Sequence, residues 1–227
     1  VDAYIHEKMM QLFQLYIIVG GMPAAVQTYM DSNNIQNVVK EQRDIINLYK
    51  KDIARYDQDV RKKLYIDEVF DLIPSELNAK NKRFILKRLN ENMTFGRHEN
   101  DFIWLKDADM ALPTYNVEEP VSPLKLSEQR NLFKLFQNDV GLLSCQYSSG
   151  CIQLKILQGK VNVNYGSVFE NAVAQELHAH GWDLYYFNSK KQGEIDFILE
   201  TDDEIIPLEV KSGKDYERNN ALSKLLS

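Results

Sequence analysis

The sequence predicts a mixed α and β protein, an α+β or α/β chain with a mostly helical first part and a later part in which one helix precedes three strands. Two observations carry this prediction. Through most of the first half, apolar residues recur at intervals of three and four, as they do in amphipathic helices. From residue 111 onward, short apolar runs are separated by polar turns, and such runs are typical of strands.

The first part contains two well-marked helices. An apolar stripe predicts a long helix over residues 35–56, because one helical face can then be buried. A second helix is expected over residues 60–73, where Pro74 ends it, since proline lacks the N–H that a continuing helix needs. The residues expected to face inward in this second helix are Leu64, Val69, Phe70 and Ile73.

A two-stranded hairpin is predicted after these helices. A further helix is expected over roughly residues 97–109, followed by strands over 111–117 and 132–137 with a polar, proline-bearing loop between them. Several helices followed by a hairpin is the order of elements in a winged-helix domain. We therefore predict such a domain over residues 33–143.

A second unit is predicted after a stretch rich in Ser, Gly, Gln and Asn between residues 144 and 164. It consists of a helix over 167–180 that Gly181 ends, strands over 182–187, 194–199 and 205–211, and a helix beginning at residue 215. Tyr185, Tyr186 and Phe187 lie in the first of these strands and are expected in the core. The domain boundary is therefore predicted at residue 144.

Composition excludes several classes of protein. The chain has 227 residues and a formal net charge of −6, which excludes a globally basic nucleic-acid binder but leaves room for a local basic stripe. The cysteines, Cys145 and Cys151, are too few for a disulfide scaffold and predict free thiols in a reducing compartment. The apolar stretch 15–26 is too short to span a bilayer, and no secretory signal begins the chain. We expect a cytoplasmic protein with no membrane partner.

Charged residues on two predicted strands suggest a metal site. Glu209 and Lys211 alternate along one strand and should share a face, while Asp196 interrupts an otherwise apolar strand. If these strands pair, Asp196 lies beside Glu209, and two carboxylates offer the oxygen ligands that Mg²⁺ or Mn²⁺ prefers. The chemistry indicated is metal-assisted phosphodiester hydrolysis, with Asp196 and Glu209 as metal ligands, the Val210 carbonyl as a further ligand and Lys211 orienting water.

Two plainer interpretations remain open at this point. Glu209 and Lys211 could form an ordinary solvated strand face, with Asp196 paired to a neighbouring lysine. Glu170 begins a predicted helix three residues after Ser167, so it could close a capping box with that serine. Alternatively, Glu170 projects toward the strand carboxylates as an outer ligand of the metal or its water.

The ordered residues Glu170, Asp196, Glu209 and Lys211 resemble the signature of the PD-(D/E)xK nuclease superfamily. A wider set of segments resembles the C-terminal region of a group of prokaryotic AAA+-type ATPases: GGMP, LYKKDIARY, FKLFQNDVGLL and YGSVFENAVAQEL. That resemblance implies an ATPase-lid remnant over 1–32, the winged helix over 33–143 and a restriction-endonuclease-like domain over 144–227. It also implies a truncated nuclease core and an ATPase domain of the same polypeptide as partner. No phosphate-binding G-x-x-x-x-G-K-[ST] motif is present.

A basic segment precedes the hairpin and is a candidate nucleic-acid contact. Its cations can neutralise phosphates without reading sequence; they are Lys80, Lys82, Arg83, Lys87 and Arg88. The next predicted helix is acidic, which argues against major-groove reading by that helix; its acidic residues are Glu99, Asp101, Asp107 and Asp109. A solvated surface or a face for an acidic protein partner is the alternative.

Two functions from different classes follow from these residues. The first is a Mg²⁺- or Mn²⁺-dependent hydrolase of nucleic-acid phosphodiester bonds, with Glu170, Asp196, Glu209 and Lys211 at its site. The second is a non-catalytic DNA- or protein-binding regulatory module built on a nuclease-like scaffold. The sequence leaves the choice between DNA and RNA open, and also the oligomeric state.

Overall fold

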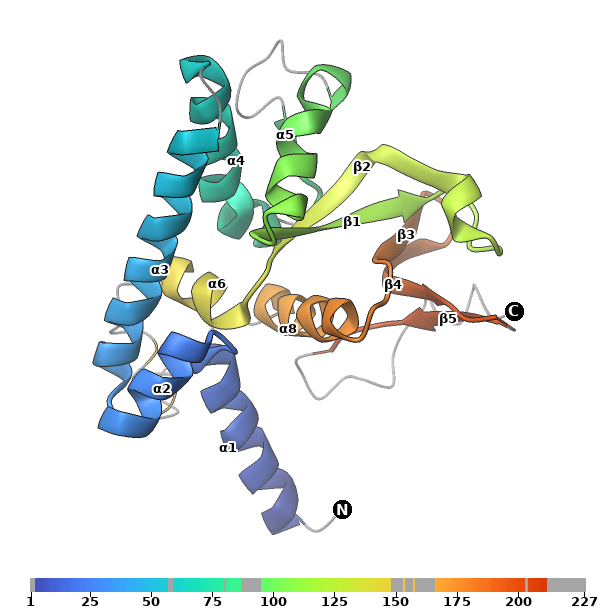
Figure 1. The fold of residues 1–227 in the computed structure, drawn as a ribbon. Helices are drawn as coiled ribbons and strands as arrows, with labels where there is room; N and C mark the ends of the chain where they lie inside the picture. The colour runs from blue at the N-terminus through green and yellow to red at the C-terminus, as the bar shows by residue number, and fades with distance from the viewer. Residues whose placement is uncertain are drawn as a thin grey trace.

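Helices and one five-stranded sheet make up the described part of the chain in the computed structural model (Figure 1). The described residues are 3–56, 59–79, 81–86, 95–147, 153, 157, 166–202 and 204–211. Their helices are α1 (Ala3–Val19), α2 (Pro23–Ser32), α3 (Ile35–Tyr56), α4 (Val60–Leu77), α5 (Phe95–Asp107), α6 (Val140–Tyr147) and α8 (Gly166–Ala179). The strands are β1 (Ala111–Val117), β2 (Glu128–Gln137), β3 (Tyr185–Ser189), β4 (Gly193–Glu200) and β5 (Ile205–Leu208), and a short 3₁₀ helix, η2 (Leu124–Ser127), precedes β2. The helix predicted from residue 215 lies outside the described residues.

The predicted hairpin and the three later strands are all present. β1 and β2 pair antiparallel, and β3, β4 and β5 form a second antiparallel run. β2 begins earlier than predicted, at Glu128, while β5 ends earlier, at Leu208. The predicted burial of Tyr185, Tyr186 and Phe187 in β3 is confirmed.

A parallel pairing between β1 and β3 joins the two strand groups into one sheet of order β2-β1-β3-β4-β5. Tyr115 lies opposite Tyr185, and Val117 lies opposite Phe187. The side-chain oxygen of Asn116 also accepts a hydrogen bond of 2.9 Å from the backbone of Asn188. The boundary predicted at residue 144 therefore divides the strands of one continuous sheet.

The long helix predicted from the apolar stripe is confirmed as α3, with the bounds expected. Helix α4 continues past the predicted end, because Pro74 lies inside it and Leu77 ends it. An interior proline removes one backbone hydrogen bond and can kink a helix without ending it. The carbonyl of Pro74 accepts a hydrogen bond of 2.8 Å from the Tyr147 hydroxyl. The prediction that Pro74 ends the helix was wrong.

The inward face of α4 also differs at one position. Leu64 is 57% exposed, whereas Ile66 is completely buried. Ile66, Phe70 and Ile73 are spaced as one helical face requires, and Leu64 points away from that face. The expectation that Leu64 faces the core was wrong, while those for Val69, Phe70 and Ile73 are confirmed.

Two apolar cores lie against the sheet. The larger one gathers the helices, and its largest members include Phe70, Phe102 and Phe133. Figure 1 shows α3 running beside α4, with α8 between α6 and the strands β3 to β5. The smaller core consists of Val117, Leu124, Tyr185, Phe187, Ile195 and Ile198. Cys145 on α6 is buried with a free thiol, and Cys151 lies outside the described residues.

Helix α1 extends away from the rest of the chain and is followed by α2 (Figure 1). In the described part of the chain, no single helix combines the length and apolar composition needed to cross a membrane. α1 and α2 meet that requirement only as a pair, and the chain bends by 119° between them.

At the bend after α1, the side chain of Asp139 packs closely against the backbone of Gly20 and Gly21. This aspartate is almost fully buried, and its carboxylate accepts hydrogen bonds from the backbone of Gly21 at 2.6 Å and Leu142 at 2.9 Å. Gly20 has a φ of +74°, and a Cβ there would lie 2.2 Å from the Asp139 carboxylate. The GGMP and NDVGLL segments, distant in sequence, therefore form one structural junction.

Replacing Gly20 with alanine should destabilise the chain by about 2–4 kcal/mol, because the new Cβ adds a steric clash to an unfavourable positive φ. Gly181→Ala is the matched control: its φ is +83°, and nothing lies within 4 Å of the added Cβ. That variant should lose only about 1 kcal/mol. Urea denaturation of both variants measures the difference, and equal losses would contradict the proposed clash.

Candidate functional site

Helix α8 is held against the sheet by a side chain that bonds to backbone. The Asn171 amide accepts a hydrogen bond of 2.7 Å from the Gln137 N–H and donates one of 3.0 Å to the Gln137 carbonyl. The Gln175 side chain accepts a third, of 2.8 Å, from the backbone of Val140. These bonds hold α8 against the end of β2 and the start of α6, and so fix the direction in which Glu170 points.

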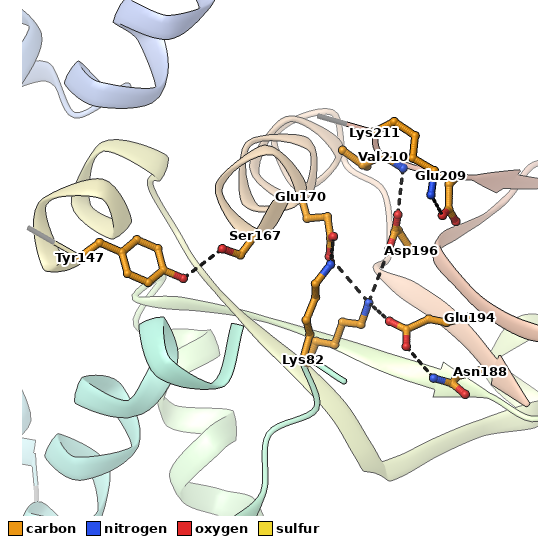
Figure 2. A network of polar contacts seen from close by, with 11 residues as sticks. Lys82, Tyr147, Ser167, Glu170, Asn188, Glu194, Asp196, Glu209, Val210 and Lys211 are labelled. Carbon is orange, nitrogen blue, oxygen red and sulfur yellow. Dashed lines mark hydrogen bonds and ion pairs between the residues drawn. The ribbon is translucent and has the colours of Figure 1, made fainter. Parts of the chain in front are cut away.

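Glu170 points from α8 toward the strands, as Figure 2 shows. One carboxylate oxygen forms an ion pair with Lys82. The Ser167 hydroxyl instead lies 3.2 Å from the Tyr147 hydroxyl, and Ser167 is itself within α8. The arrangement is therefore the one in which Glu170 projects toward the strand carboxylates, and a capping box with Ser167 is not formed.

A β-bulge in β4 lies beside Asp196. Tyr185 pairs with Ile198 and Phe187 pairs with Ile195, so β4 uses one residue more than β3 over this stretch. Such a bulge re-aims side chains and is frequent beside active sites. Ile195 and Ile198 pack in the smaller core, while Phe197 joins the larger one. Asp196, between them, is left nearly buried at 7% exposure.

Lys134 of β2 lies at the centre of these acids. Its side chain is completely buried, with its ammonium nitrogen 2.7 Å from a Glu194 oxygen and 3.9 Å from oxygens of both Glu170 and Asp196. Burial alone would lower the pKa of Lys134, but the negative charges of Glu194, Glu170 and Asp196 raise it above its ordinary value. Lys134 is therefore a charged ammonium inside the sheet.

The residues after β5 complete the cluster. The backbone N–H of Val210 donates a hydrogen bond of 2.9 Å to Asp196. Lys211 bonds to Glu209 over 2.6 Å (Figure 2). The side chain of Lys211 is about one-third exposed. Glu209 and Lys211 thus share one side of the chain, as their alternation predicts, and Asp196 lies beside this segment.

The pKa of Asp196 reflects these surroundings. This pKa is raised to about 6, first by burial and then by the negative charges of Glu170 and Glu209. Lys134 and the Val210 N–H act in the opposite direction. Asp196 is consequently a carboxylate that is costly to ionise, close to two others.

The predicted site residues fall into two groups. Glu170, Asp196 and Glu209 come together, while the ammonium of Lys211 bonds to Glu209. Lys82, expected on a basic surface, is bound to Glu170 instead. Burial raises the pKa of the Tyr186 hydroxyl, and the positive charge of Arg83 opposes that increase. Lys80, Lys87 and Arg88 lie outside the described residues.

The acidic helix has a partner of its own. Glu99 on α5 forms an ion pair of 2.5 Å with Arg130 of β2. α5 ends at Asp107, and Asp109 follows with a φ of +51°. Glu99, one of the acidic residues that argue against binding of this helix in the DNA major groove, is therefore paired with a residue of the same chain.

Sequence reasoning missed Lys134 and Glu194. Lys134 is the one charged residue in the segment LFKLFQ, and a lone charge inside an apolar strand needs buried partners. That was an available signal. Glu194 stands in GEIDF two residues before Asp196, so alternation alone puts both acids on one face.

The donor chemistry of the cluster fits a divalent cation. Glu170 and Glu209 each have one buried carboxylate oxygen without a hydrogen-bond partner, and such oxygens are the ligands that Mg²⁺ and Mn²⁺ prefer. The other oxygen of Glu170 is engaged by Lys82. Among the described residues, no three His, Cys, Asp or Glu side chains are arranged to hold a metal ion. Metal binding therefore requires these side chains to rearrange.

Two family models match the chain. Residues 10–150 match a family described as Domain of unknown function (DUF8612). Residues 165–227 match Domain of unknown function (DUF4143), a domain found in AAA-ATPase-associated proteins. No curated protein and no solved structure gives a match. The first matched segment contributes Lys82 and Lys134 to the cluster, and the second contributes its acids.

Asp196→Asn should stabilise the folded chain at pH 7.5. Because the folded pKa of about 6 exceeds the unfolded value of about 3.9, ionisation of Asp196 costs stability as pH rises from about 4 to about 6. The amide keeps an acceptor for Val210, so we expect a gain of about 1–3 kcal/mol at pH 7.5 that shrinks at pH 4.5. Denaturation at both pH values measures it, with Asp202→Asn in the exposed turn after β4 as control. A pH-independent gain would contradict the assignment.

Lys134→Met should destabilise the chain by about 3–5 kcal/mol at pH 7.5, because it leaves buried carboxylates without their counter-charge. Lys125→Met, at an exposed position of η2, should change stability by less than about 0.5 kcal/mol. Chemical denaturation compares the two variants. A loss below about 1 kcal/mol for Lys134→Met would show that the ammonium is not holding the acids together.

Proposed function

We propose that this chain, which belongs to the family described as Domain of unknown function (DUF8612), carries a metal-dependent nucleic-acid phosphodiester hydrolase site where α8 meets the sheet. The observation that supports this most directly is the convergence of Glu170 from α8, Asp196 from β4 and Glu209 from the segment that follows β5. Burial and the like charges of Glu170 and Glu209 raise the pKa of Asp196, and a divalent cation relieves such repulsion.

The order of elements supports a nuclease-like scaffold. α8 is followed by β3, β4 and β5, the helix-strand-strand-strand order that the PD-(D/E)xK resemblance implies for residues 144–227. We propose a winged-helix-like unit for residues 33–143 and the end of an ATPase lid for residues 1–32. The DUF4143 match supports an AAA+-type ATPase domain in the same polypeptide as the partner.

The roles proposed for the site residues follow from their positions. Asp196 and Glu209 would hold Mg²⁺ or Mn²⁺, with the Val210 carbonyl as a further ligand. The bound cation would polarise the phosphate and lower the pKa of a water molecule. Glu170 would act from α8 as an outer ligand of the metal or of its bound water. Lys211, partly exposed beside Glu209, would offset negative charge on the scissile phosphate.

A specific observation favours the alternative of a non-catalytic regulatory module. Lys82 pairs with Glu170, and Lys134 lies near both Glu170 and Asp196. Lys211 is bonded to Glu209. In this arrangement the acids are already balanced by internal cations, as in a structural ion-pair network, and the fold would then serve to bind DNA or protein.

Cleavage of labelled single- and double-stranded DNA and RNA in Mn²⁺ or Mg²⁺ separates the two functions. For a hydrolase, Asp196→Ala and Lys211→Ala in the full-length protein should each lower the rate by at least about a hundredfold, since each removes a group needed in the transition state. Asp202→Ala should cleave as the wild type does. Absence of cleavage by the wild type, or cleavage retained by both site variants, would leave the regulatory module.

A further inference from the structure

Two ammonium groups act on Glu170, and they differ in their freedom to move. Lys134 is completely buried in the middle of β2. Lys82 lies in the segment 81–86 between α4 and α5, and a quarter of its side chain is exposed. A buried strand residue cannot leave its position without opening the sheet, whereas a long, partly exposed side chain can change rotamer. Lys82 is therefore the exchangeable cation of the two.

The backbone around Lys82 is held so that only the side chain need move. Lys82 has a φ of +48°, a conformation that is unfavourable for a residue with a Cβ. Its N–H bonds to the Ala79 carbonyl at 3.2 Å. Two residues later, the N–H of Phe84 bonds to the Phe133 carbonyl at 2.9 Å, and its ring stacks on that of Phe133. These contacts keep the base of Lys82 close to Glu170.

The charges of the cluster are nearly balanced. When all are ionised, four carboxylates face three ammonium groups, so one negative charge is in excess; the acids are Glu170, Glu194, Asp196 and Glu209, and the cations are Lys82, Lys134 and Lys211. With Lys82 withdrawn, two negative charges are in excess. That is the charge of one divalent cation.

The Glu170 carboxylate is the place at which a metal ion would replace Lys82. One of its oxygens binds Lys82, and the other is buried without a hydrogen bond. Releasing Lys82 would make both oxygens of a nearly inaccessible carboxylate available as ligands. Lys134 stays 3.9 Å from one of these oxygens, but a buried carboxylate with only that distant counter-charge is costly, which favours either Lys82 or a metal at this position.

We propose that Lys82 is a tethered cation that occupies the Glu170 carboxylate and exchanges with the divalent metal of the site. Metal loading then releases the Lys82 ammonium, which remains attached beside the cluster. The exchange couples the metal state of the second matched segment to a side chain of the first. This inference rests on the proposed function, because it requires a metal to bind the acidic cluster.

The direct test is Mn²⁺ affinity, measured from free Mn²⁺ by electron paramagnetic resonance at pH 7.5 with the full-length protein. Lys82→Met removes the competitor and should bind Mn²⁺ about tenfold tighter than the wild type, within the usual size of coupling between sites. Lys82→Arg keeps a competing cation and should stay near the wild type. Lys125→Met removes one exposed charge and should change the affinity less than about twofold, since its position is screened by solvent.

A second measurement needs no variant. Amine acetylation followed by mass spectrometry should show faster modification of Lys82 when Mn²⁺ is added to the wild type, with Lys125 unchanged. Unaltered Mn²⁺ affinity in Lys82→Met, or unaltered Lys82 modification while Mn²⁺ is bound, would overturn the exchange. Mn²⁺ binding that Asp196→Asn abolishes but Lys82→Met leaves unchanged would refute the exchange alone. Absence of Mn²⁺ binding in every variant would refute the proposed metal site itself.

Discussion

The buried ammonium of Lys134 is the interaction on which the arrangement of the acidic side chains depends. Removing a charge from water costs several kcal/mol unless good partners surround it. Here the partners come from α8 and β4, while the lysine comes from β2. The bonds between Asn171 and Gln137 hold α8 close enough for this arrangement. The two matched segments therefore share one electrostatic centre as well as one sheet.

Much of the secondary structure could be predicted, because its signals are local. The stripe that defines α3 and the short apolar run that defines β1 both reproduce the observed bounds. The pairing of β1 with β3 could not be predicted, since an apolar strand does not specify which distant strand will lie beside it. Pro74 misled because an interior proline removes one backbone hydrogen bond and can kink a helix without ending it.

The acidic residues were predictable to the extent that strand geometry determines them. Alternation along the chain and antiparallel pairing of β4 with β5 bring Asp196 beside Glu209. The bulge in β4 left no readable signal, because it is defined by register against β3. The roles of Lys82 and Lys134 required tertiary information, since both lie far from the acids in sequence. The motif therefore identified Glu170, Asp196, Glu209 and Lys211. It did not identify Glu194, nor Lys82 and Lys134 as counter-charges of the acids.

The parallel contact between β1 and β3 also has a consequence during synthesis. The hairpin of β1 and β2 leaves the ribosome before β3 does. Until β3 emerges, the N–H and C=O groups along the free edge of β1 have no strand to pair with. Unpaired strand edges recruit other chains. Delayed closure of such a contact makes this interval the aggregation-prone stage of folding. A chaperone that covers β1, or exchange of β3 between two nascent chains, would act at this stage.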